Sequence, residues 1–146
     1  MWIDERGSEI LPLPECRRLL AIAAKHGHHG HLGIPTEDAP VVLPLDFDVH
    51  GSDLLLRVGD GLFHRMDGRL VAFQVDNSSA GSDWSQGGTE GRWSVLVRGL
   101  ARGIDPADAG GGLPEPRVAE PGHQLVQVRG DVVTGRRLRA PDGGPR

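Results

Sequence analysis

The sequence predicts a small, mostly β domain in which antiparallel strands roll into a barrel, accompanied by few helices. The chain has 146 residues, which is the usual size of one domain with one compact core. About six short segments alternate apolar and polar side chains, as half-buried strands do. Glycine-rich turns separate several of these segments, which is typical of the hairpins in small barrels.

The amino-acid composition argues against several classes of function. The net charge is -4 at pH 7 with histidine neutral, which disfavours binding to the phosphate backbone of a nucleic acid. No apolar run reaches the ~18 residues of a membrane span, and the N-terminus lacks a basic region followed by an apolar one, so we expect neither a membrane span nor Sec-type export. Cys16 is the only cysteine, so no disulfide can form within the chain, and we expect a cytoplasmic protein. Lys25 is the only lysine, so arginine, hydroxyl or backbone N–H groups would have to hold an anionic ligand.

The N-terminal region is predicted to form an arm followed by a helix. Residues 1–13 contain only a short apolar patch and are expected to form the arm. The helix is expected over 14–25, because Pro14 suits a first turn and Gly27 suits an end. Its apolar side chains recur along one stripe, at Cys16, Leu19, Leu20 and Ala23.

Histidines dominate the next segment, at His26, His28, His29 and His31. Interleaved glycines favour a loop in its first half, with a short strand starting near Gly30. Imidazoles at this density could bind zinc, nickel or haem iron. Because neither a cysteine nor a well-placed carboxylate completes a zinc site, we favour a solvated loop over a metal site.

A half-buried strand is predicted over 41–49, where apolar side chains fall at every second position. Pro44 cannot donate a backbone hydrogen bond, so this point is an edge, a bulge or a place where backbone faces a ligand. Asp46, Asp48 and His50 share the other face and could do acid–base chemistry. Polar side chains on the solvent face of a strand give the same pattern, and we favour that interpretation.

The middle of the chain is predicted to form hairpins around a short helix. A turn at 51–53 leads into a strand at 54–58, and glycines then permit a sharp turn before a short helix at 62–66. Alternation returns at 70–76, and a polar, glycine-rich loop is expected over 77–91.

The last third of the chain is predicted to complete the sheet. The longest strand is expected at 92–102, followed by a loop or a frayed helix over 103–122. Two further strands are expected at 125–129 and 133–138. Residues 139–146 are expected to form a flexible tail, and the sequence contains no internal repeat.

Six stretches of the sequence carry a family resemblance. They are ECRRLL (15–20), VLPLDF (42–47), LLRVGDG (55–61), VAFQVD (71–76), WSVLVRGLAR (93–102) and LVQVRGDVVTGRRL (125–138). In order and spacing these stretches resemble the pyridoxamine 5'-phosphate oxidase-like flavin proteins, specifically their short bacterial subgroup. The resemblance implies a mostly β (α+β) fold. Its residues 14–138 would form a six-stranded antiparallel Greek-key split β-barrel with a few short helices. It also implies a homodimer with two FMN sites at the subunit interface.

The resemblance further implies where the cofactor would bind. Backbone at 43–46 would face the flavin ring, the segment from Arg57 to Gly61 would hold the phosphate, and the segment 134–137 would reach the partner's cofactor. Arg57 beside two glycines can itself combine a guanidinium with exposed N–H groups, although an arginine in an ordinary hairpin gives the same pattern. The candidate cofactor-binding residues are Pro44, Leu45, Asp46, Arg57, Val58, Gly61, Arg65, Trp93, Ser94 and Arg137.

Strand parity restricts two of these candidates. Trp93 shares its parity with Val95 and Val97, which favours the core or the dimer interface over stacking on a cofactor. Arg136 and Arg137 are neighbours on a strand and point to opposite faces, so only one can address a shared ligand. The family pattern favours Arg137.

One segment departs from the family pattern. Val58, Leu62 and Phe63 stand where members usually carry two hydroxyl residues and a lysine. A lost lysine removes a charge-assisted phosphate contact worth about 1.5–3 kcal/mol. Either His64 and Arg65 replace that contact, or FMN is bound weakly, or the pocket holds another ligand.

Two functions therefore stand side by side. The first is a flavin- or deazaflavin-dependent oxidoreductase acting on a small conjugated substrate, in which the cofactor carries the hydride chemistry. The second is a non-catalytic member that has lost tight flavin binding and acts as a ligand-binding or stress-response protein for haem or an apolar ligand. The retained Arg57, Gly59 and Gly61 favour the first, and the absent lysine and hydroxyls favour the second. No side chain stands out as a catalytic acid, base or nucleophile.

Overall fold

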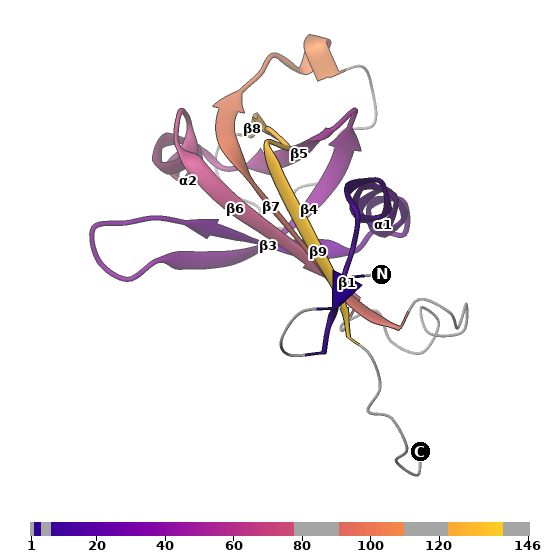
Figure 1. The fold of residues 1–146 in the computed structure, drawn as a ribbon. Helices are drawn as coiled ribbons and strands as arrows, with labels where there is room; N and C mark the ends of the chain where they lie inside the picture. Colours follow the sequence, from indigo (N-terminus) through magenta and orange to yellow (C-terminus); the bar gives the residue numbers. More distant parts are fainter. Residues whose placement is uncertain (1, 4–6, 78–90, 110–122, 139–146) are drawn as a thin grey trace.

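Strand β7 (Arg92–Gly103) is the central element of the fold, because it pairs with three other strands (Figure 1). One edge of β7 pairs with β6 (Leu70–Asp76). The other edge pairs first with β9 (Val132–Leu138) and then with β8 (Gln124–Val128). This computed structural model describes residues 2–3, 7–77, 91–109 and 123–138.

Gly99 lies where β7 changes its partner. Arg98 is the last β7 residue opposite β9, and Ala101 is the first opposite β8. A Cβ atom at Gly99 would lie 1.8 Å from the carbonyl oxygen of Arg129. The missing side chain lets the two segments approach closely, and the Arg129 N–H donates to the carbonyl of Leu100 at 3.0 Å.

Six strands close into a barrel. Strands β3 (His29–Ile34), β4 (Val41–His50) and β5 (Asp53–Val58) follow one another as antiparallel neighbours. Strand β6 returns to lie beside β3, which makes a Greek key, and β8 joins β5 to β7. The order β7–β6–β3–β4–β5–β8 and back to β7 confirms the predicted antiparallel Greek-key barrel, mostly β with few helices.

Strand β4 belongs to both sides of the barrel. Its residues 41–46 pair with β3, whereas 47–50 pair with β5. Among the described strands, none pairs with the first half of β4 on the edge away from β3. Pro44 lies in this half, so its missing N–H removes no bond to a second strand, which fits the edge among the three predicted alternatives.

The sheet extends beyond the barrel on the β9 side. Strand β2 (Glu9–Ile10) pairs with β9, and β1 (Trp2–Ile3) pairs with β2. The sequence predicts only an arm for residues 1–13, because strands of 2 residues are too short to show alternation.

Helix α1 (Leu13–Lys25) agrees with the predicted helix to within one residue at its start. It buries the predicted stripe of Cys16, Leu19, Leu20 and Ala23 and packs against β4 and β9. Helix α2 (Asp60–Met66) buries Met66 and contacts β7 and β8. A 3-10 helix at Pro106–Ala109 lies in the tract that was expected to be a loop or a frayed helix.

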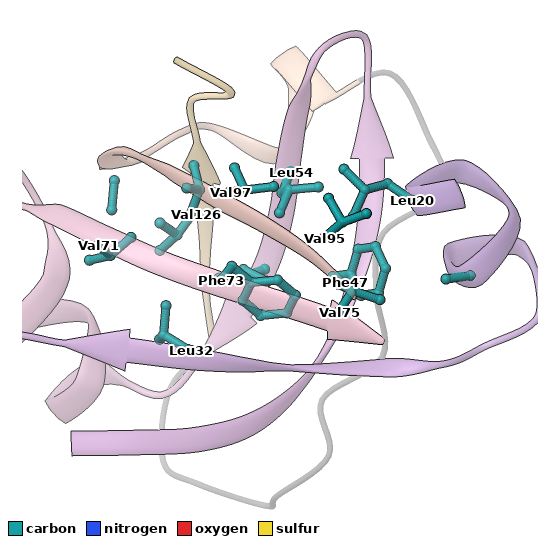
Figure 2. Close-up of a cluster of buried hydrophobic side chains, with 14 of the residues drawn as sticks. Leu20, Leu32, Phe47, Leu54, Val71, Phe73, Val75, Val95, Val97 and Val126 are labelled. Atoms are coloured by element: carbon teal, nitrogen blue, oxygen red, sulfur yellow. The ribbon is translucent and has the colours of Figure 1, made fainter. Parts of the chain in front are cut away.

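The barrel interior holds the hydrophobic core (Figure 2). The rings of Phe47 and Phe73 meet there with centroids 5.4 Å apart. Along β6, Val71, Phe73 and Val75 are buried while the residues between them are not, as the alternation predicts. The alternate side chains point away from the barrel. We call the surface they form on residues 41–46 of β4 and on β3, β6, β7 and β9 the outer face.

Several predicted loops lie outside the described residues. These are most of the loop 77–91, residues 110–122 and the tail 139–146. The described ends of the first loop are linked, because Asn77 Nδ2 donates to the carbonyl of Gly91 at 2.6 Å and the Trp93 N–H donates to Asn77 Oδ1 at 2.9 Å. In the parts of the chain that the structure describes, no helix is both long and apolar enough to cross a membrane.

Candidate functional site

The end of β5 carries the candidate anion site. Arg57 is half-buried and lies opposite Leu125 of β8, while its neighbours Leu56 and Val58 are buried in the core. Since successive strand side chains alternate, the Arg57 guanidinium points to the outside of the barrel. The N-cap of α2 is Gly59, which has no side chain to accept from the first N–H groups of the helix. A guanidinium and backbone N–H groups, both of which bind anions, therefore lie at the same end of β5.

The turn that follows β5 is open and carries both signs of charge. His64 and Arg65 are exposed in the last turn of α2. Asp60 lies in the first turn and accepts a hydrogen bond from Gln124 Nε2 at 3.1 Å. Gly61 is exposed, and a Cβ atom there would meet nothing within 4 Å. A ligand can therefore approach this turn from solvent.

The departures from the family pattern have a structural reason. Val58 is 2% exposed, so its side chain lies in the core and only its backbone can face a ligand. Leu62 and Phe63 are partly buried and pack against the core. A Cβ atom at Gly103 would lie 2.6 Å from Phe63 Cε2, so the Phe63 ring occupies the space over this glycine. An aromatic side chain thus fills a packing position where the family pattern has a lysine.

Residues 44–46 lie on the open edge of β4. Pro44 is exposed, Leu45 is half-buried against the core, and Asp46 is half-buried opposite His29 of β3. Among the described strands, none pairs with this edge, so it is an open edge of the sheet. Helix α1 also packs against β4. This arrangement is compatible with backbone contact to a planar ligand.

Asp48 and His50 lie on the second half of β4. Asp48 is half-buried, and its Oδ1 accepts the N–H of Val49 at 2.8 Å, while His50 is exposed. Because β4 pairs with β3 up to Asp46 and with β5 from Phe47 onward, these two side chains lie on the part of β4 that is next to β5. This arrangement fits polar groups on a solvent face.

Ser94 belongs to a polar row on the outer face. It lies opposite Asp76 of β6 and Arg136 of β9. Gln74 Nε2 donates to Asp76 Oδ2 at 2.9 Å and to Ser94 Oγ at 3.0 Å. Trp93 points the other way and is 2% exposed, as its parity predicts for a core residue. Ser94 can therefore address a ligand on the outer face, whereas the Trp93 ring lies inside the barrel.

Arg137 lies between two carboxylates. Its Nη2 is 3.2 Å from Glu15 Oε1, and its Nη1 is 3.5 Å from Glu9 Oε2. Glu15 also pairs with Arg18, whose Nη2 is 2.6 Å from Oε1. The hydrogen bond from Arg18 lowers the pKa of Glu15; burial opposes this, and the charges of Arg18 and Arg137 add to it. Arg137 therefore ties β9 to β2 and α1, while Arg136 points to the opposite face, as strand alternation predicts for neighbouring residues.

The histidine run lies partly in β3 rather than in a solvated loop. His29 and His31 share the outer face of this strand, with ring centroids 5.4 Å apart. Burial lowers the pKa of His28, and the charges of His26 and His29 add to this effect. Among the described residues, no group of three or more His, Cys, Asp or Glu side chains is arranged to hold a metal ion.

A groove that the sequence did not predict opens beside the β3–β4 hairpin, which projects from the barrel at the left of Figure 1. It has a volume of about 620 Å³, and its lining is mostly apolar. Gly33 of β3 and Ala72 of β6 lie opposite each other in its lining. Two small residues at strand positions are the only feature of the sequence that could have indicated this groove. None of the candidate cofactor-binding residues lines it.

The structure distributes the candidate residues over three places. The β5–α2 turn holds Arg57, Val58, Gly61 and Arg65; the edge of β4 holds Pro44, Leu45 and Asp46; and β7 and β9 hold Trp93, Ser94 and Arg137. The side chains of Val58 and Trp93 are committed to the core. The side chains of Arg57 and Ser94 are partly exposed on the outside of the barrel.

The strand order and its closure through β7 and β8 define the class of split-barrel proteins. The family model described as Pyridoxamine 5'-phosphate oxidase matches residues 14–135, which is most of the chain. The chain therefore belongs to the pyridoxamine 5'-phosphate oxidase family, as its sequence motifs predict. No curated protein matches the sequence.

Several solved structures are similar over nearly the whole chain. The FAD binding protein from Mycobacterium smegmatis is 28% identical, with a TM-score of 0.68, over 90% of this chain and 98% of that chain. A conserved protein of unknown function from Corynebacterium diphtheriae is 19% identical, with a TM-score of 0.68, over 90% of this chain and 98% of that chain. A FAD-binding protein from Mesorhizobium loti is 19% identical, with a TM-score of 0.62, over 88% and 96% of the two chains. The last two similarities establish the shared fold.

Proposed function

We propose that this protein is a homodimeric oxidoreductase that binds a flavin nucleotide, FMN or FAD, in a pocket between two subunits. The similarity to a protein named for FAD binding, at 28% identity over 90% of this chain, is the observation that carries the proposal. Membership of the pyridoxamine 5'-phosphate oxidase family supports it. A deazaflavin, which has the same ring shape, is the third cofactor to be tested.

The β5–α2 turn is the proposed phosphate site. Arg57 supplies a permanent positive charge there, and Arg65 on α2 supplies a second. The side chains of Val58 and Phe63 are packed against the core and contribute no phosphate contact. Because this leaves fewer charge-assisted bonds than the family pattern, FMN is held less tightly than in other members. FAD adds a second phosphate and an adenine, and therefore offers more places to be held.

The proposed chemistry belongs to the flavin, which transfers a hydride to or from a small conjugated substrate. The chain would bind and orient the ring along the open edge of β4, where residues 44–46 present backbone groups. The polar row around Ser94 and Gln74 offers hydroxyl and amide groups for hydrogen bonds on the outer face.

The second candidate function is a non-catalytic binding protein for haem or an apolar ligand. Its supporting observation is the packing of Phe63 over Gly103, which replaces a phosphate-binding lysine by a core contact. A protein with this role would show weak affinity for every flavin.

Flavin titration of the purified apoprotein tests the proposal. We expect FMN or FAD to bind, and Arg57→Ala to weaken the binding at least about tenfold, because a charged hydrogen bond to phosphate is lost. The matched control is Arg17→Ala, at an exposed arginine on α1, which should leave the affinity unchanged. Quenching of flavin fluorescence measures the affinity.

The outcomes separate the two candidate functions. Failure to bind FMN, FAD and a deazaflavin would refute the flavin proposal. A Soret band in the purified protein, without flavin absorbance, would favour the haem-binding alternative. If Arg57→Ala binds flavin as well as the wild type, Arg57 is not part of the phosphate site.

The proposed assembly is a homodimer in the bacterial cytoplasm. The family resemblance implies flavin sites between subunits, and this supports a link between the proposed dimer and the proposed cofactor site. Cys16 is buried and free, which suits a reducing compartment. Sedimentation of the purified protein over a range of concentrations measures the assembly directly.

A further inference from the structure

Two histidines on the outer face of β3 have no part in the proposed flavin site. His29 and His31 lie two positions apart on the strand, so both side chains project on the same side of the sheet. Their ring centroids are 5.4 Å apart, with the His31 side chain exposed and the His29 side chain half-buried. Imidazole is the commonest side-chain ligand of transition metals in proteins, so this pair is a candidate for metal binding.

Strand β3 holds the backbone of this pair in place. The strand pairs on both edges, and His31 lies between Pro44 of β4 and Gln74 of β6. Gly30, which separates the two histidines, faces the core, where a Cβ atom would collide with the ring of Phe73. Ligands on a paired strand are positioned more precisely than ligands on a loop, which favours a defined geometry for a bound ion.

The spacing of the two rings matches tetrahedral coordination. A zinc ion lies about 2.05 Å from an imidazole nitrogen, and hence about 3.2 Å from the centre of the ring. Two imidazoles on one tetrahedral ion then have centroids about 5.2 Å apart, against 5.4 Å for His29 and His31. Neighbouring imidazoles on a square-planar ion such as Cu²⁺ would have centroids about 4.5 Å apart. The geometry of the pair therefore favours Zn²⁺.

The other histidine pair of this segment is spaced differently. The ring centroids of His26 and His28 are 6.3 Å apart, which would require an angle of about 160° at a shared metal ion. His26 is the C-cap of α1, and Gly27, with φ of 70°, makes the turn between the two histidines. This pair therefore lacks both the strand scaffold and the tetrahedral spacing, and it provides a comparison within the same segment.

The charges around the β3 pair favour a cation. Asp46 lies directly opposite His29 on β4, and side chains at such positions are within reach of each other. A histidine that binds a metal usually donates its second ring N–H to a carboxylate or a carbonyl group, and Asp46 offers a carboxylate. Asp76, which accepts a hydrogen bond from Gln74, adds a second carboxylate on the outer face. Strands β3 and β6 and residues 41–46 contain no lysine or arginine.

We propose that His29 and His31 bind a divalent transition-metal ion, with Zn²⁺ as the expected ion and one nitrogen of each imidazole as a ligand. Among the described residues, no third His, Cys, Asp or Glu side chain is arranged to join them. Water or an incoming ligand would fill the remaining positions, as in other zinc sites that are open to solvent. The inference concerns a second site and does not rest on the proposed flavin function.

Zinc titration of the full chain, prepared without a histidine tag, tests the site. We expect isothermal titration calorimetry to show one Zn²⁺ bound per chain. His29→Gln and His31→Gln should each raise the dissociation constant at least about tenfold, because loss of a supporting hydrogen bond alone costs about 10–100-fold in metal affinity. The matched controls are His26→Gln and His28→Gln, which make the same substitution in the same segment and should leave the affinity unchanged. Circular dichroism checks that all four variants are folded.

NMR spectra of the imidazole nitrogens identify the ligands directly. We expect Zn²⁺ to shift the ring nitrogens of His29 and His31 but not those of His26 and His28. A wild-type protein without saturable Zn²⁺ binding would overturn the inference. Equal losses of affinity in all four variants would also overturn it, because they would show adventitious binding by a histidine-rich segment. None of these measurements requires a bound flavin, so failure of the flavin proposal would leave this site standing.

Discussion

The Phe63 ring packs over Gly103 in space that a side chain at position 103 would otherwise occupy. The Phe63 ring would lie 2.6 Å from a Cβ atom at Gly103, so the glycine makes room for the aromatic residue. Asp67, at the end of α2, accepts the N–H of Gly103 at 2.9 Å. These contacts fix α2 on β7, and they place an apolar side chain at a position that the family pattern gives to a phosphate contact.

Phe63→Lys is predicted to raise the affinity for FMN and to lower the stability of the fold. The lysine restores a charged hydrogen bond to phosphate, so we expect FMN to bind about tenfold more tightly or better. Loss of the ring from its place over Gly103 should lower the free energy of unfolding by about 1–3 kcal/mol. Fluorescence titration and urea denaturation measure the two effects. His64→Lys, at the exposed next position, is the control, and equal gains in both variants would show that general charge is responsible.

The sequence predicts whether a single side chain is buried or exposed where the alternation of a strand determines its direction. The sequence places Trp93 with Val95 and Val97, and the structure buries all three. It could not predict that Phe63 packs over Gly103, because this contact joins residues far apart in the chain and shows no local pattern. The groove was missed for a similar reason, since its hollow arises from small residues on neighbouring strands.

At the scale of elements, charged side chains connect α1 to the edge of the sheet. Arg137 of β9 pairs with Glu15 of α1 and with Glu9 of β2. Glu15 is shared with Arg18 on its own helix, at 2.6 Å from Nη2. This group of four side chains complements the apolar contact between α1 and the barrel.

The Glu15 carboxylate gives this connection a predictable pH dependence. Its pKa in the folded protein lies below the ordinary value of 4.5, so its contribution is fully present above that pH and is lost as the pH falls through the folded-state pKa. Glu15→Gln should lower the free energy of unfolding at neutral pH by about 0.5–1 kcal/mol, in the range of partly exposed ion pairs. The difference from the wild type should shrink in acid.

Urea denaturation at several pH values measures this difference. Glu37→Gln, at an exposed position of the β3–β4 hairpin, is the control and should show little effect at any pH. A deficit of Glu15→Gln that stays constant into acid would contradict an electrostatic role for Glu15.

Most elements were predictable because they are long enough to show a period. The strands at 41–50, 70–76 and 92–103 each contain several apolar–polar alternations, and α1 has a clear stripe. Strands β1 and β2 were not predictable, because two residues carry no period. The division of β7 between two partners also has no sequence signal beyond Gly99, since one glycine in a strand has several structural explanations.

At the scale of the whole molecule, the barrel was predictable from the number and spacing of its strands, and the family motifs supplied the Greek-key order. The assembly and the cofactor depend on surfaces rather than on the core. Binding of a cofactor to the folded state stabilises the entire chain, so global stability reports on the proposed function.

FMN is predicted to raise the melting temperature of the protein more than riboflavin does. At about 100 times its dissociation constant a ligand adds about 2.7 kcal/mol, which corresponds to a rise of about 5–10 °C for a chain of this size. Riboflavin lacks the phosphate, so at the same concentration its shift should be smaller. Differential scanning fluorimetry measures both, and Arg57→Ala is expected to narrow the difference. Equal shifts with the two ligands would show that the phosphate is not held.

The position of β7 between β6 on one edge and β8 and β9 on the other has a consequence for synthesis of the chain. Residues 70–103 leave the ribosome before 124–138, so one edge of the longest strand has no partner until the final strands emerge. Contacts between segments so far apart form slowly, and an unpaired strand edge attracts other chains in the meantime. The nascent protein is therefore most prone to aggregation just before its last strands are translated.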